Sequence, residues 1–529
     1  MPSDCITYQN SGYFSKLIVD YLGEKQDLKP LYHRFPTLEN FKAQIEEKVA
    51  QFSNESRSIL VAELEKQYAN FEISETTANN LILLNHPNTF TITTGHQLNL
   101  FTGPLYFLYK IISTINLCKE LKSAYPTYDF VPIYWMATED HDFDEINYFN
   151  FKGKKIQWNK KSSGPVGRLS TIGLKEVLEQ FTFELGSSEN ANHLRELFQK
   201  SYLEQSNLAD ATRFLANELF KNDGLVIIDG DSKELKKLFI PYAADELLHQ
   251  TAFNKVSETN LLFEAYKIQV NPREINLFYI EDDSRERIVF ENNRYKINNT
   301  PIEFSEGELL AELENHPEKF SPNVILRPLY QEIILPNLCY IGGGGEIAYW
   351  LELKSNFDYN KVPFPILLVR NSVVLATEKQ LKKAAKLGMT WSDLFLNQDE
   401  LINLKTKEYS QFTIDFSEQK DTLKKQFEKL KSIAHQTNSS FLGAVKAQET
   451  KQIKGLENLE KRLLKAERRV HSDVLERITL LQNELFPNQS LQERKANFAE
   501  FFEAYGIEFL AKLGHELRPL QSNFTIIKL

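Results

Sequence analysis

Two short stretches of the chain combine side chains that acid–base and ligand-binding chemistry uses. The first reads Thr94-Gly95-His96-Gln97-Leu98-Asn99 and holds a histidine between a glycine and two amide side chains. The second reads Glu139-Asp140-His141-Asp142-Phe143-Asp144-Glu145, which places five carboxylates around one histidine. Carboxylates accept protons and bind cations, and histidine exchanges a proton near neutral pH. Both stretches are therefore candidate parts of a binding or catalytic site.

Each stretch follows a segment with the pattern of a strand. Residues 89–93 alternate threonine with apolar side chains, and the apolar run 130–137 suits a strand buried on both faces of a parallel sheet. Between them, Pro104 fits a first helical position that Thr102 caps, and a buried helical stripe continues to about Leu121. This strand, helix, strand unit brings both loops to the carboxyl edge of the sheet, where open α/β sheets bind ligands. A solvated turn or a capped helix start explains either loop alone, whereas the two together favour a site.

The same order of strand, polar loop and helix is predicted again further along the chain. Arg327 and Arg370 follow predicted strands at 323–326 and 365–369, where a guanidinium can hold a carboxylate or phosphate with two bonds. A salt-bridged arginine at the sheet edge is the alternative for each. Gly342–Gly345 separate another strand from a helix and allow backbone amides to approach an anion, although a tight turn explains them equally. They match neither the Walker nor the dinucleotide pattern.

Length and composition limit the classes of protein that the chain can represent. Its 529 residues predict two or three domains, and no apolar run approaches the roughly 20 residues of a membrane span. The net charge of −10 disfavours binding to long nucleic acids. The N-terminus lacks the pattern of a secretion signal, and the three cysteines are few and scattered. We expect a cytoplasmic protein that binds neither membrane nor nucleic acid.

The composition changes after about residue 374 to Lys, Glu, Gln and Leu with little strand signal. Apolar residues at 4-3-4 spacing from Leu423, and again from Leu456 onward, predict an antiparallel helical hairpin of coiled-coil type. The second helix is about twice as long as the first, and its surplus apolar stripe predicts a homodimer formed through this arm. The predicted organisation has three parts: an α/β, Rossmann-like parallel-sheet core over 1–375 with insertions at about 149–205 and 251–320; a coiled-coil arm over 376–490; and a C-terminal segment, 491–529, that docks back on the core.

Four blocks of sequence resemble a known family. Thr94-Gly95-His96-Gln97 with Leu100-Phe101-Thr102-Gly103-Pro104-Leu105-Tyr106, and the acidic stretch 139–145, resemble the bacillithiol biosynthesis cysteine-adding enzyme. Two further blocks match: Leu326-Arg327-Pro328-Leu329 through Gly342-Gly343 to Glu346-Ile347-Ala348-Tyr349-Trp350, and Gln492-Glu493-Arg494 with Tyr505-Gly506. The match spans almost the whole chain, and its acidic block is the specific part.

The resemblance implies a ligase that joins L-cysteine through an amide bond to the glucosamine amine of glucosaminyl-malate. A free carboxylate must be activated first, so ATP or ADP is a candidate cofactor, and Mg²⁺ is another. The candidate catalytic residues are His96, Asp140, His141, Asp142 and Asp144. The candidate substrate- or nucleotide-binding residues are Gly95, Gln97, Asn99, Thr102, Gly103, Glu139, Arg327, Gly343, Gly344, Glu346 and Arg370. We expect His96, Gln97 and Asn99 to stabilise a phosphate, the three aspartates to bind ammonium groups or Mg²⁺, and His141 to act as base.

Two other classes of function stay open at this point. Gly-His after the first core strand also resembles the nucleotidyl-transferring superfamily that includes class I aminoacyl-tRNA synthetases. The second histidine of that superfamily is not in its usual place, and no lysine-rich signature loop matches. An adenylating enzyme with another small substrate is one alternative. A non-catalytic coiled-coil assembly protein is the other.

Overall fold

The computed structural model describes residues 4–437 and 439–529, which divide into two compact units. The first unit contains residues 13–374 and 492–527 together with the N-terminal residues up to Gln9. The second contains residues 10–12, 375–491 and 528–529. The segment that begins at Gln492 therefore belongs to the same compact unit as the central sheet.

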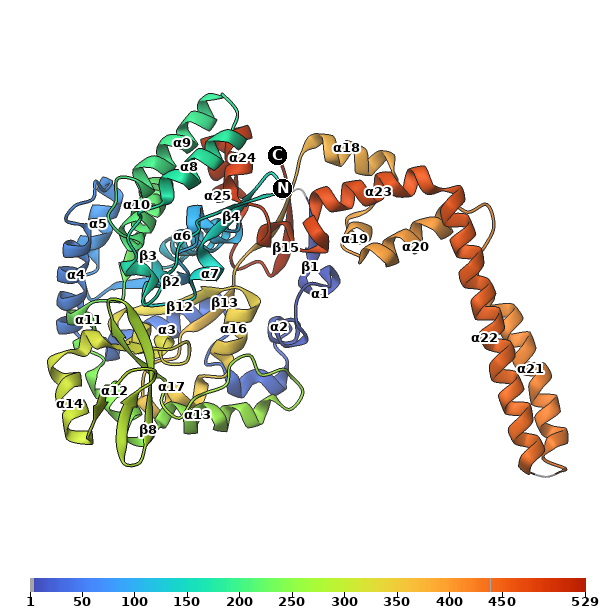
Figure 1. Ribbon diagram of the computed structural model, residues 1–529, viewed down its shortest axis with the longest axis horizontal. Coiled ribbons are helices and arrows are strands. Elements are labelled where there is room, and N and C mark those ends of the chain that lie inside the picture. The colour runs from blue at the N-terminus through green and yellow to red at the C-terminus, as the bar shows by residue number, and fades with distance from the viewer. Residues whose placement is uncertain (1–3, 438) are drawn as a thin grey trace. The chain divides into compact units, whose positions relative to one another are not determined.

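Five parallel strands form the sheet at the centre of the first unit, in the order β13-β12-β2-β3-β6 (Figure 1). Their bounds are β2 Thr89–His96, β3 Asp129–Met136, β6 Val226–Asp229, β12 Asn337–Gly342 and β13 Ile366–Val369. Nearly every position of these strands is buried, as a parallel sheet covered on both faces requires. Because all five strands run in one direction, the loops after their carboxyl ends share one edge. The predicted Rossmann-like α/β core is confirmed.

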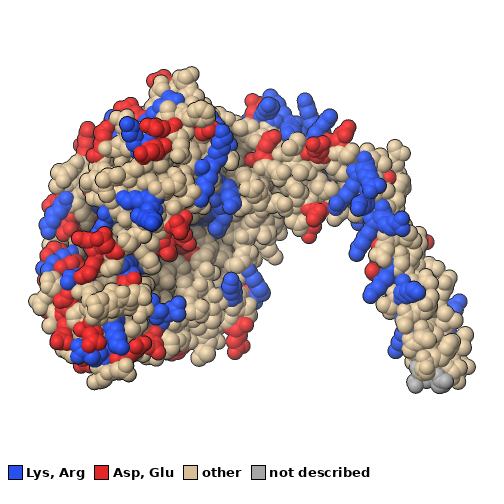
Figure 2. Space-filling view, viewed as in Figure 1, with Lys and Arg blue, Asp and Glu red and all other residues tan. Residues whose placement is uncertain are grey.

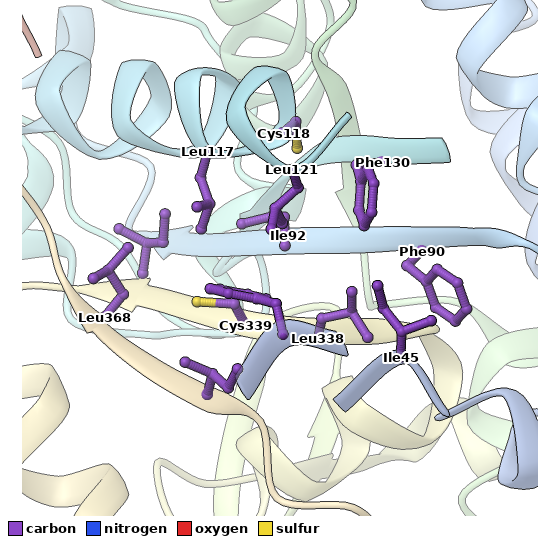
Figure 3. Packing of buried hydrophobic residues seen from close by; sticks show 13 residues of the cluster. Ile45, Phe90, Ile92, Leu117, Cys118, Leu121, Phe130, Leu338, Cys339 and Leu368 are labelled. Atoms are coloured by element: carbon purple, nitrogen blue, oxygen red, sulfur yellow. The ribbon is translucent and has the colours of Figure 1, made fainter. Parts of the chain in front are cut away.

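One apolar cluster joins this sheet to its neighbouring helices (Figure 3). It draws side chains from α3 (Leu38–Gln51), from α6 (Tyr106–Ala124) and from four of the strands. Its buried members are Phe41, Ile45, Phe90, Ile92, Leu117, Cys118, Leu121, Phe130, Leu338, Cys339, Ile341, Ile366 and Leu368. Each large apolar side chain contributes about 1.5–3 kcal/mol by its burial. The cluster holds β2 and β3 in place, and with them the two loops that follow.

Two local predictions around these strands are wrong. Residues 323–326 form a turn instead of a strand, because the Asn323 side chain accepts hydrogen bonds from the backbone N–H groups of Ile325 and Leu326. Arg327 is the first residue of the helix α15 (Arg327–Ile334), where Pro328 fits the first turn. Thr102 caps no helix: its φ is +67°, and α6 begins only at Tyr106.

A second sheet of five antiparallel strands follows α13 (Thr251–Asn260) in the first unit, in the order β10-β9-β8-β7-β11. The strands are β7 Leu277–Glu281, β8 Ser284–Glu291, β9 Arg294–Ile297, β10 Glu303–Phe304 and β11 Phe320–Pro322. Asn292 and Asn293 both have positive φ and form the turn between β8 and β9, as a tight hairpin requires. We call this the inserted sheet.

Helices cover both sheets of the first unit. Those before and just after the first strand pair are α2 Lys16–Leu22, α4 Asn54–Tyr68, α5 Glu75–Leu83 and α7 Phe143–Ile146. The middle of the chain adds α8 Leu174–Glu184, α9 Glu189–Tyr202, α10 Leu208–Phe220, α11 Lys233–Lys237, α12 Ile240–His249, α13 Thr251–Asn260 and α14 Glu306–Asn315. The last are α16 Gly344–Leu351, α17 Lys354–Asn360, α24 Phe498–Tyr505 and α25 Ile507–Glu516.

Two small sheets remain: the pair β4 (Tyr148–Phe151) and β5 (Lys154–Gln157), and the trio β1 (Asp4–Thr7), β15 (Asn523–Lys528) and β14 (Ser372–Ala376).

The second unit is helical and contains the predicted coiled coil. Its helices are α18 Glu378–Lys386, α19 Trp391–Leu394, α20 Gln398–Tyr409, α21 Ser417–Ala434, α22 Ser439–Val470 and α23 Ser472–Leu485. Lys420 pairs with Glu460 and Lys431 with Glu449, so α21 and α22 run antiparallel. Lys and Arg gather on this unit around the junction of α22 with α23 (Figure 2). None of the helices within residues 4–437 and 439–529 has the length and apolar character that crossing a bilayer requires.

Candidate active site

A cavity of about 930 Å³ opens at the carboxyl edge of the central sheet, within the first unit. Its walls come from the loops after β2, β3, β12 and β13, from the inserted sheet, and from residues 269–275 before that sheet. The lining includes eleven of the predicted site residues: Gly95, His96, Gln97, Glu139, Asp140, His141, Asp142, Arg327, Gly343, Glu346 and Arg370. His96 and Asp142, which lie 46 positions apart in the chain, thus face one cavity.

The other five predicted residues lie away from this lining. Asn99, Thr102 and Gly103 belong to a tight turn in which a β-carbon on Gly103 would meet that of Asn99 at 2.6 Å. Within the same turn the Phe101 ring packs against four other phenylalanine rings. This segment holds the loop in place from behind. Asp144 and Gly344 are the remaining two.

The two predicted loops contact each other through Gln97. Its Nε2 donates to Asp140 Oδ2 and to Glu145 Oε2, both at 3.0 Å. Asn99 Nδ2 donates to the Glu145 backbone carbonyl at 3.3 Å. These amides donate to the acidic loop and set its position relative to β2. The phosphate contacts that we expected of them stay a prediction.

The acidic loop gathers three side chains that could hold a cation. Asp140, His141 and Asp142 each place one ligand atom within 4.8 Å of the others. Asp144 is not in this group, because its carboxylate accepts a bond from Asn147 instead, at 3.4 Å. Burial, and then the neighbouring Asp140 carboxylate, raise the pKa of Asp142 above its ordinary value. Asp142 is therefore a better proton acceptor than an isolated aspartate.

His141 contacts the inserted sheet. Its Nδ1 lies 2.9 Å from Nη1 of Arg285, whose guanidinium stacks 4.1 Å from the centre of the Phe278 ring. Arginine can only donate, so Nδ1 is the acceptor in this bond. The bond uses the lone pair of Nδ1. In this arrangement Nδ1 is engaged by Arg285, and the role of base that we expected of His141 stays a prediction.

His96 is buried at the end of β2 and faces the cavity. It is 8% exposed, and its ring packs against Tyr106 and Phe107. Among the described residues, no hydrogen-bond partner reaches its Nε2. Burial, together with the nearby cations Lys110 and Arg370, lowers the pKa of His96 well below its usual value. The imidazole is therefore neutral at physiological pH and offers an unused nitrogen to a ligand.

A buried ion pair forms the base of the cavity. Lys110, on α6, contacts Glu346 at 2.5 Å and donates to the Gly95 backbone carbonyl at 2.7 Å. Glu346 also accepts from the Gly343 N–H at 2.9 Å and from the Tyr340 hydroxyl at 2.7 Å. Burial alone would raise the pKa of Glu346, but Lys110 and these donors together lower it. The Glu346 carboxylate thus already occupies the start of α16, where we expected the glycines to receive an anion.

The two predicted arginines have different surroundings. Arg370 donates to Glu493 at 2.7 Å, and both side chains are almost completely buried. Arg327 has no carboxylate partner among the described residues; it bonds to Gln331 and to the Tyr349 hydroxyl. Arg370 therefore matches the salt-bridged alternative, whereas Arg327 keeps its charge available to the cavity.

Several cavity residues escaped the sequence prediction. Lys110 lies in the middle of an apolar helix, and the periodicity of that helix suggests only a packing role for its residues. Arg273, Arg285, Arg287 and Arg494 lie in segments without a recognisable motif, although Arg494 falls in the last matching block. A lone lysine inside a buried helical stripe was the one local signal that could have identified Lys110.

A further set of charges supports the acidic loop from behind. Lys236 Nζ lies 2.5 Å from Glu139 Oε1 and 3.5 Å from Asp231, and Asp231 pairs with Arg168 at 2.9 Å. Lys236 is 2% exposed. These pairs link the end of β3 to the end of β6 and leave Asp140 and Asp142 as the carboxylates that face the cavity more openly.

The cavity thus brings carboxylates, cations and a neutral histidine together within one volume. Its carboxylates attract ammonium groups, and its cations bind carboxylates or phosphates. A proton acceptor and fixed donors in one partly closed cavity are what acyl transfer to an amine requires.

Comparisons with known proteins agree along the full length of the chain. Residues 1–371 match the family model described as "Bacillithiol biosynthesis BshC, N-terminal Rossmann-like domain", and residues 373–529 match "Bacillithiol biosynthesis BshC, C-terminal coiled-coil domain". A relative from Flavobacterium johnsoniae is 65% identical over 527 residues, with all of both chains covered. A relative from Flavobacterium psychrophilum is 66% identical over 529 residues, also with all of both chains covered, and one from Bacillus cereus is 28% identical over 97% of this chain and 98% of its own. All three are named "Putative cysteine ligase BshC".

Proposed function

The chain belongs to the BshC family of bacillithiol biosynthesis, and we propose that it joins L-cysteine through an amide bond to the amine of glucosaminyl-malate. We place this reaction in the cavity at the carboxyl edge of the central sheet. The observation that carries the proposal is that one cavity is lined both by the carboxylates Asp140 and Asp142 and by Arg327, a cation without a carboxylate partner among the described residues. Each substrate carries both amine and carboxylate groups, so a cavity with both kinds of lining group suits them.

The part of the lining formed by Asp140 and Asp142 is our candidate site for the attacking amine. Asp140 and Asp142 attract the amine as an ammonium ion, but the amine must lose a proton before it can attack a carbonyl carbon. Asp142 has a pKa raised by burial and by Asp140, and it faces the cavity. His141 is bound to Arg285 through Nδ1. We therefore assign the role of base to Asp142.

The part of the lining formed by Arg327 is our candidate site for a substrate carboxylate. Arg327 lines the cavity with a guanidinium that no carboxylate of the described residues neutralises, and such a group binds carboxylates with two parallel bonds. His96 lies nearby as a neutral ring whose Nε2 is unused. In this proposal Arg327 binds the carboxylate, and His96 contacts the oxygen that becomes negatively charged during acyl transfer.

Activation of the cysteine carboxylate is the remaining requirement. ATP or ADP would supply the phosphoryl or adenylyl group that turns a carboxylate oxygen into a leaving group. Asp140 is the side chain of this group that would help to hold an accompanying Mg²⁺, because Asp142 is assigned as the base and Nδ1 of His141 accepts from Arg285. The assay therefore tests ATP, ADP and Mg²⁺ singly and together.

The test is product formation by purified protein. We expect wild-type chain incubated with L-cysteine, glucosaminyl-malate, nucleotide and Mg²⁺ to form bacillithiol, detected by mass spectrometry. Asp142→Asn should reduce the rate by about 10²–10⁴-fold, because a positioned proton acceptor contributes about that much. It should leave the fold intact, since an exposed loop carboxylate adds little stability.

Lys461→Ala is the matched control. Lys461 is an exposed charge in the second unit, and its removal should change neither rate nor stability. Wild-type rates from Asp142→Asn would show that the acidic loop is a structural turn. Absence of product from the wild-type chain under every combination would refute the proposed reaction itself.

A further inference from the structure

A series of buried polar side chains runs from below the central sheet to the cavity. Lys48, on α3, pairs with Glu332 at 3.4 Å, and the two are 1% and 2% exposed. The Gln331 Nε2 donates to Glu332 Oε1 at 3.0 Å, and Gln331 is completely buried. At the cavity end, Arg327 Nη1 donates to Gln331 Oε1 at 2.9 Å. These four residues form a continuous series of polar contacts that ends at the cavity.

The orientation of the Gln331 amide follows from its neighbours. The Glu332 carboxylate receives bonds from the Lys48 ammonium, from Gln331 and from Asn337, the last at 2.6 Å. Arginine can only donate, so the amide oxygen of Gln331 must face Arg327. The NH₂ group of Gln331 then faces the Glu332 carboxyl group. A reversed amide would set two donors against each other at Arg327 and leave the carboxylate facing an oxygen.

The Arg327 guanidinium is held from other sides as well. Its Nη2 contacts the Tyr349 hydroxyl at 3.4 Å. The rings of Trp135, Tyr340 and Trp350 lie 5.7, 5.7 and 5.9 Å from its central carbon, within the range of cation–π attraction. None of these contacts neutralises the charge. The side chain is therefore fixed in orientation while it remains an intact cation at the cavity wall.

A purely structural role explains this arrangement less well. Ion pairs buried as deeply as Lys48 and Glu332 are often no more stabilising than apolar side chains of similar volume. The pair does fix the orientation of the Gln331 amide, whose oxygen accepts the hydrogen bond from Arg327. A guanidinium whose orientation is set before binding loses less freedom when it takes up a carboxylate.

We propose that Gln331 is a positioning residue that holds Arg327 ready to bind a substrate carboxylate, and that Lys48 and Glu332 set the direction in which Gln331 does so. This inference rests on the proposed function, because it assigns the carboxylate-binding step to Arg327. Gln331 itself touches no substrate. Its effect must therefore pass through Arg327 and be lost when Arg327 is lost.

The test is a double-mutant cycle in steady-state kinetics with the full chain. Arg327→Met should raise the KM for one of the two substrates about 100-fold, since charge-assisted bidentate pairs are the stronger hydrogen bonds. Gln331→Met should raise the same KM about tenfold with kcat changed less than twofold, because the interaction is made equally in ground and transition states. In the Arg327→Met background, Gln331→Met should add no further increase.

Gln44→Met is the matched control for losing a buried amide. Gln44 is also completely buried and bonds to Arg34 and to the Phe364 carbonyl, away from the cavity. Gln44→Met should lower the stability of the fold without changing the KM for either substrate. If Gln331→Met fails to fold, Gln331→Asn keeps an amide in place but withdraws it from Arg327 by one methylene, and it should give the same separation of KM from kcat.

The outcomes separate this inference from the proposed function. An active wild-type chain with an unchanged KM in Gln331→Met, or with effects that add in the double variant, overturns the inference alone. If the wild-type chain forms no product, calorimetric titration with L-malate measures the same coupling between Arg327 and Gln331 without turnover. A chain that neither forms product nor binds L-malate overturns both.

Discussion

The ion pair at the base of the cavity allows a quantitative prediction. Lys110→Met removes the ammonium group from a side chain that is 4% exposed and leaves the Glu346 carboxylate with two weaker donors, Tyr340 and Gly343. Breaking a buried pair in this way costs about 3–5 kcal/mol, because one charge stays buried without its partner. Glu346 is 26% exposed, so water compensates in part. We expect a loss of about 3 kcal/mol at pH 7.

The pH dependence of this loss has a definite sign. In the wild-type chain the pKa of Glu346 is lowered, so its contribution to stability is present above the ordinary carboxyl pKa and disappears as pH falls through the lowered value. In Lys110→Met, burial is no longer outweighed and the pKa of Glu346 rises. A raised carboxyl pKa destabilises the fold at neutral pH, and protonation relieves this as pH falls. The deficit of the variant should therefore shrink from pH 8 to pH 5.

Urea unfolding followed by tryptophan fluorescence measures the effect. Trp135 and Trp350 lie beside the cavity, and a Trp391→Phe background removes the tryptophan of the second unit. The double variant Lys110→Met, Glu346→Gln removes both charges and should recover most of the loss. A deficit below about 1 kcal/mol at pH 7, or one that grows on acidification, would refute the view that this pair neutralises a buried charge.

Two further predictions concern other parts of the chain. Deleting residues 416–485 and rejoining the ends should give a monomer with an intact first unit. The reason is that Leu459 and Val470 expose apolar side chains on the arm, which a second copy of the chain would cover. The prediction of a dimer fails if sedimentation shows that the full chain is already monomeric at micromolar concentration. Burial raises the pKa of Glu246 to about 7, so the fold binds its proton more tightly than the unfolded chain does, and this group makes the wild-type chain less stable as pH rises. Relative to Glu246→Gln, the wild type should lose about 2 kcal/mol between pH 5.5 and 8 in urea titrations, and parallel pH profiles would contradict this.

Much of the fold could be predicted from the sequence because its signals are local. The strands β2 and β3, the helix between them and the hairpin of α21 with α22 each follow from a repeating pattern within about 20 residues. The pairing of parallel strands then brings the loops after β2 and β3 to one edge without further information. His96 and Asp142 could be placed in one site on that basis alone.

The two wrong local predictions have causes that can be named. Residues 323–326 are apolar enough for a strand, but the Asn323 side chain bonds its own backbone and turns the chain into α15. Thr102 looks like a helix cap, yet the packing of Phe101 forces the backbone around it into a left-handed turn. Both outcomes depend on which side chains meet in space, which the spacing of residue types does not reveal.

The sequence by itself determined the class of fold, the order of its elements and the edge of the sheet at which the site lies. Only the tertiary structure decided which polar groups there are free to act. Gln97 donates to the acidic loop, Arg370 is neutralised by Glu493, and Arg327 keeps its charge. Lys110 becomes part of the site because α6 turns it beneath Gly95 and towards Glu346. The reason is physical: a charge acts according to its burial and its partners, and the charged partners of Arg370 and Lys110, Glu493 and Glu346, lie more than 100 positions away in the chain.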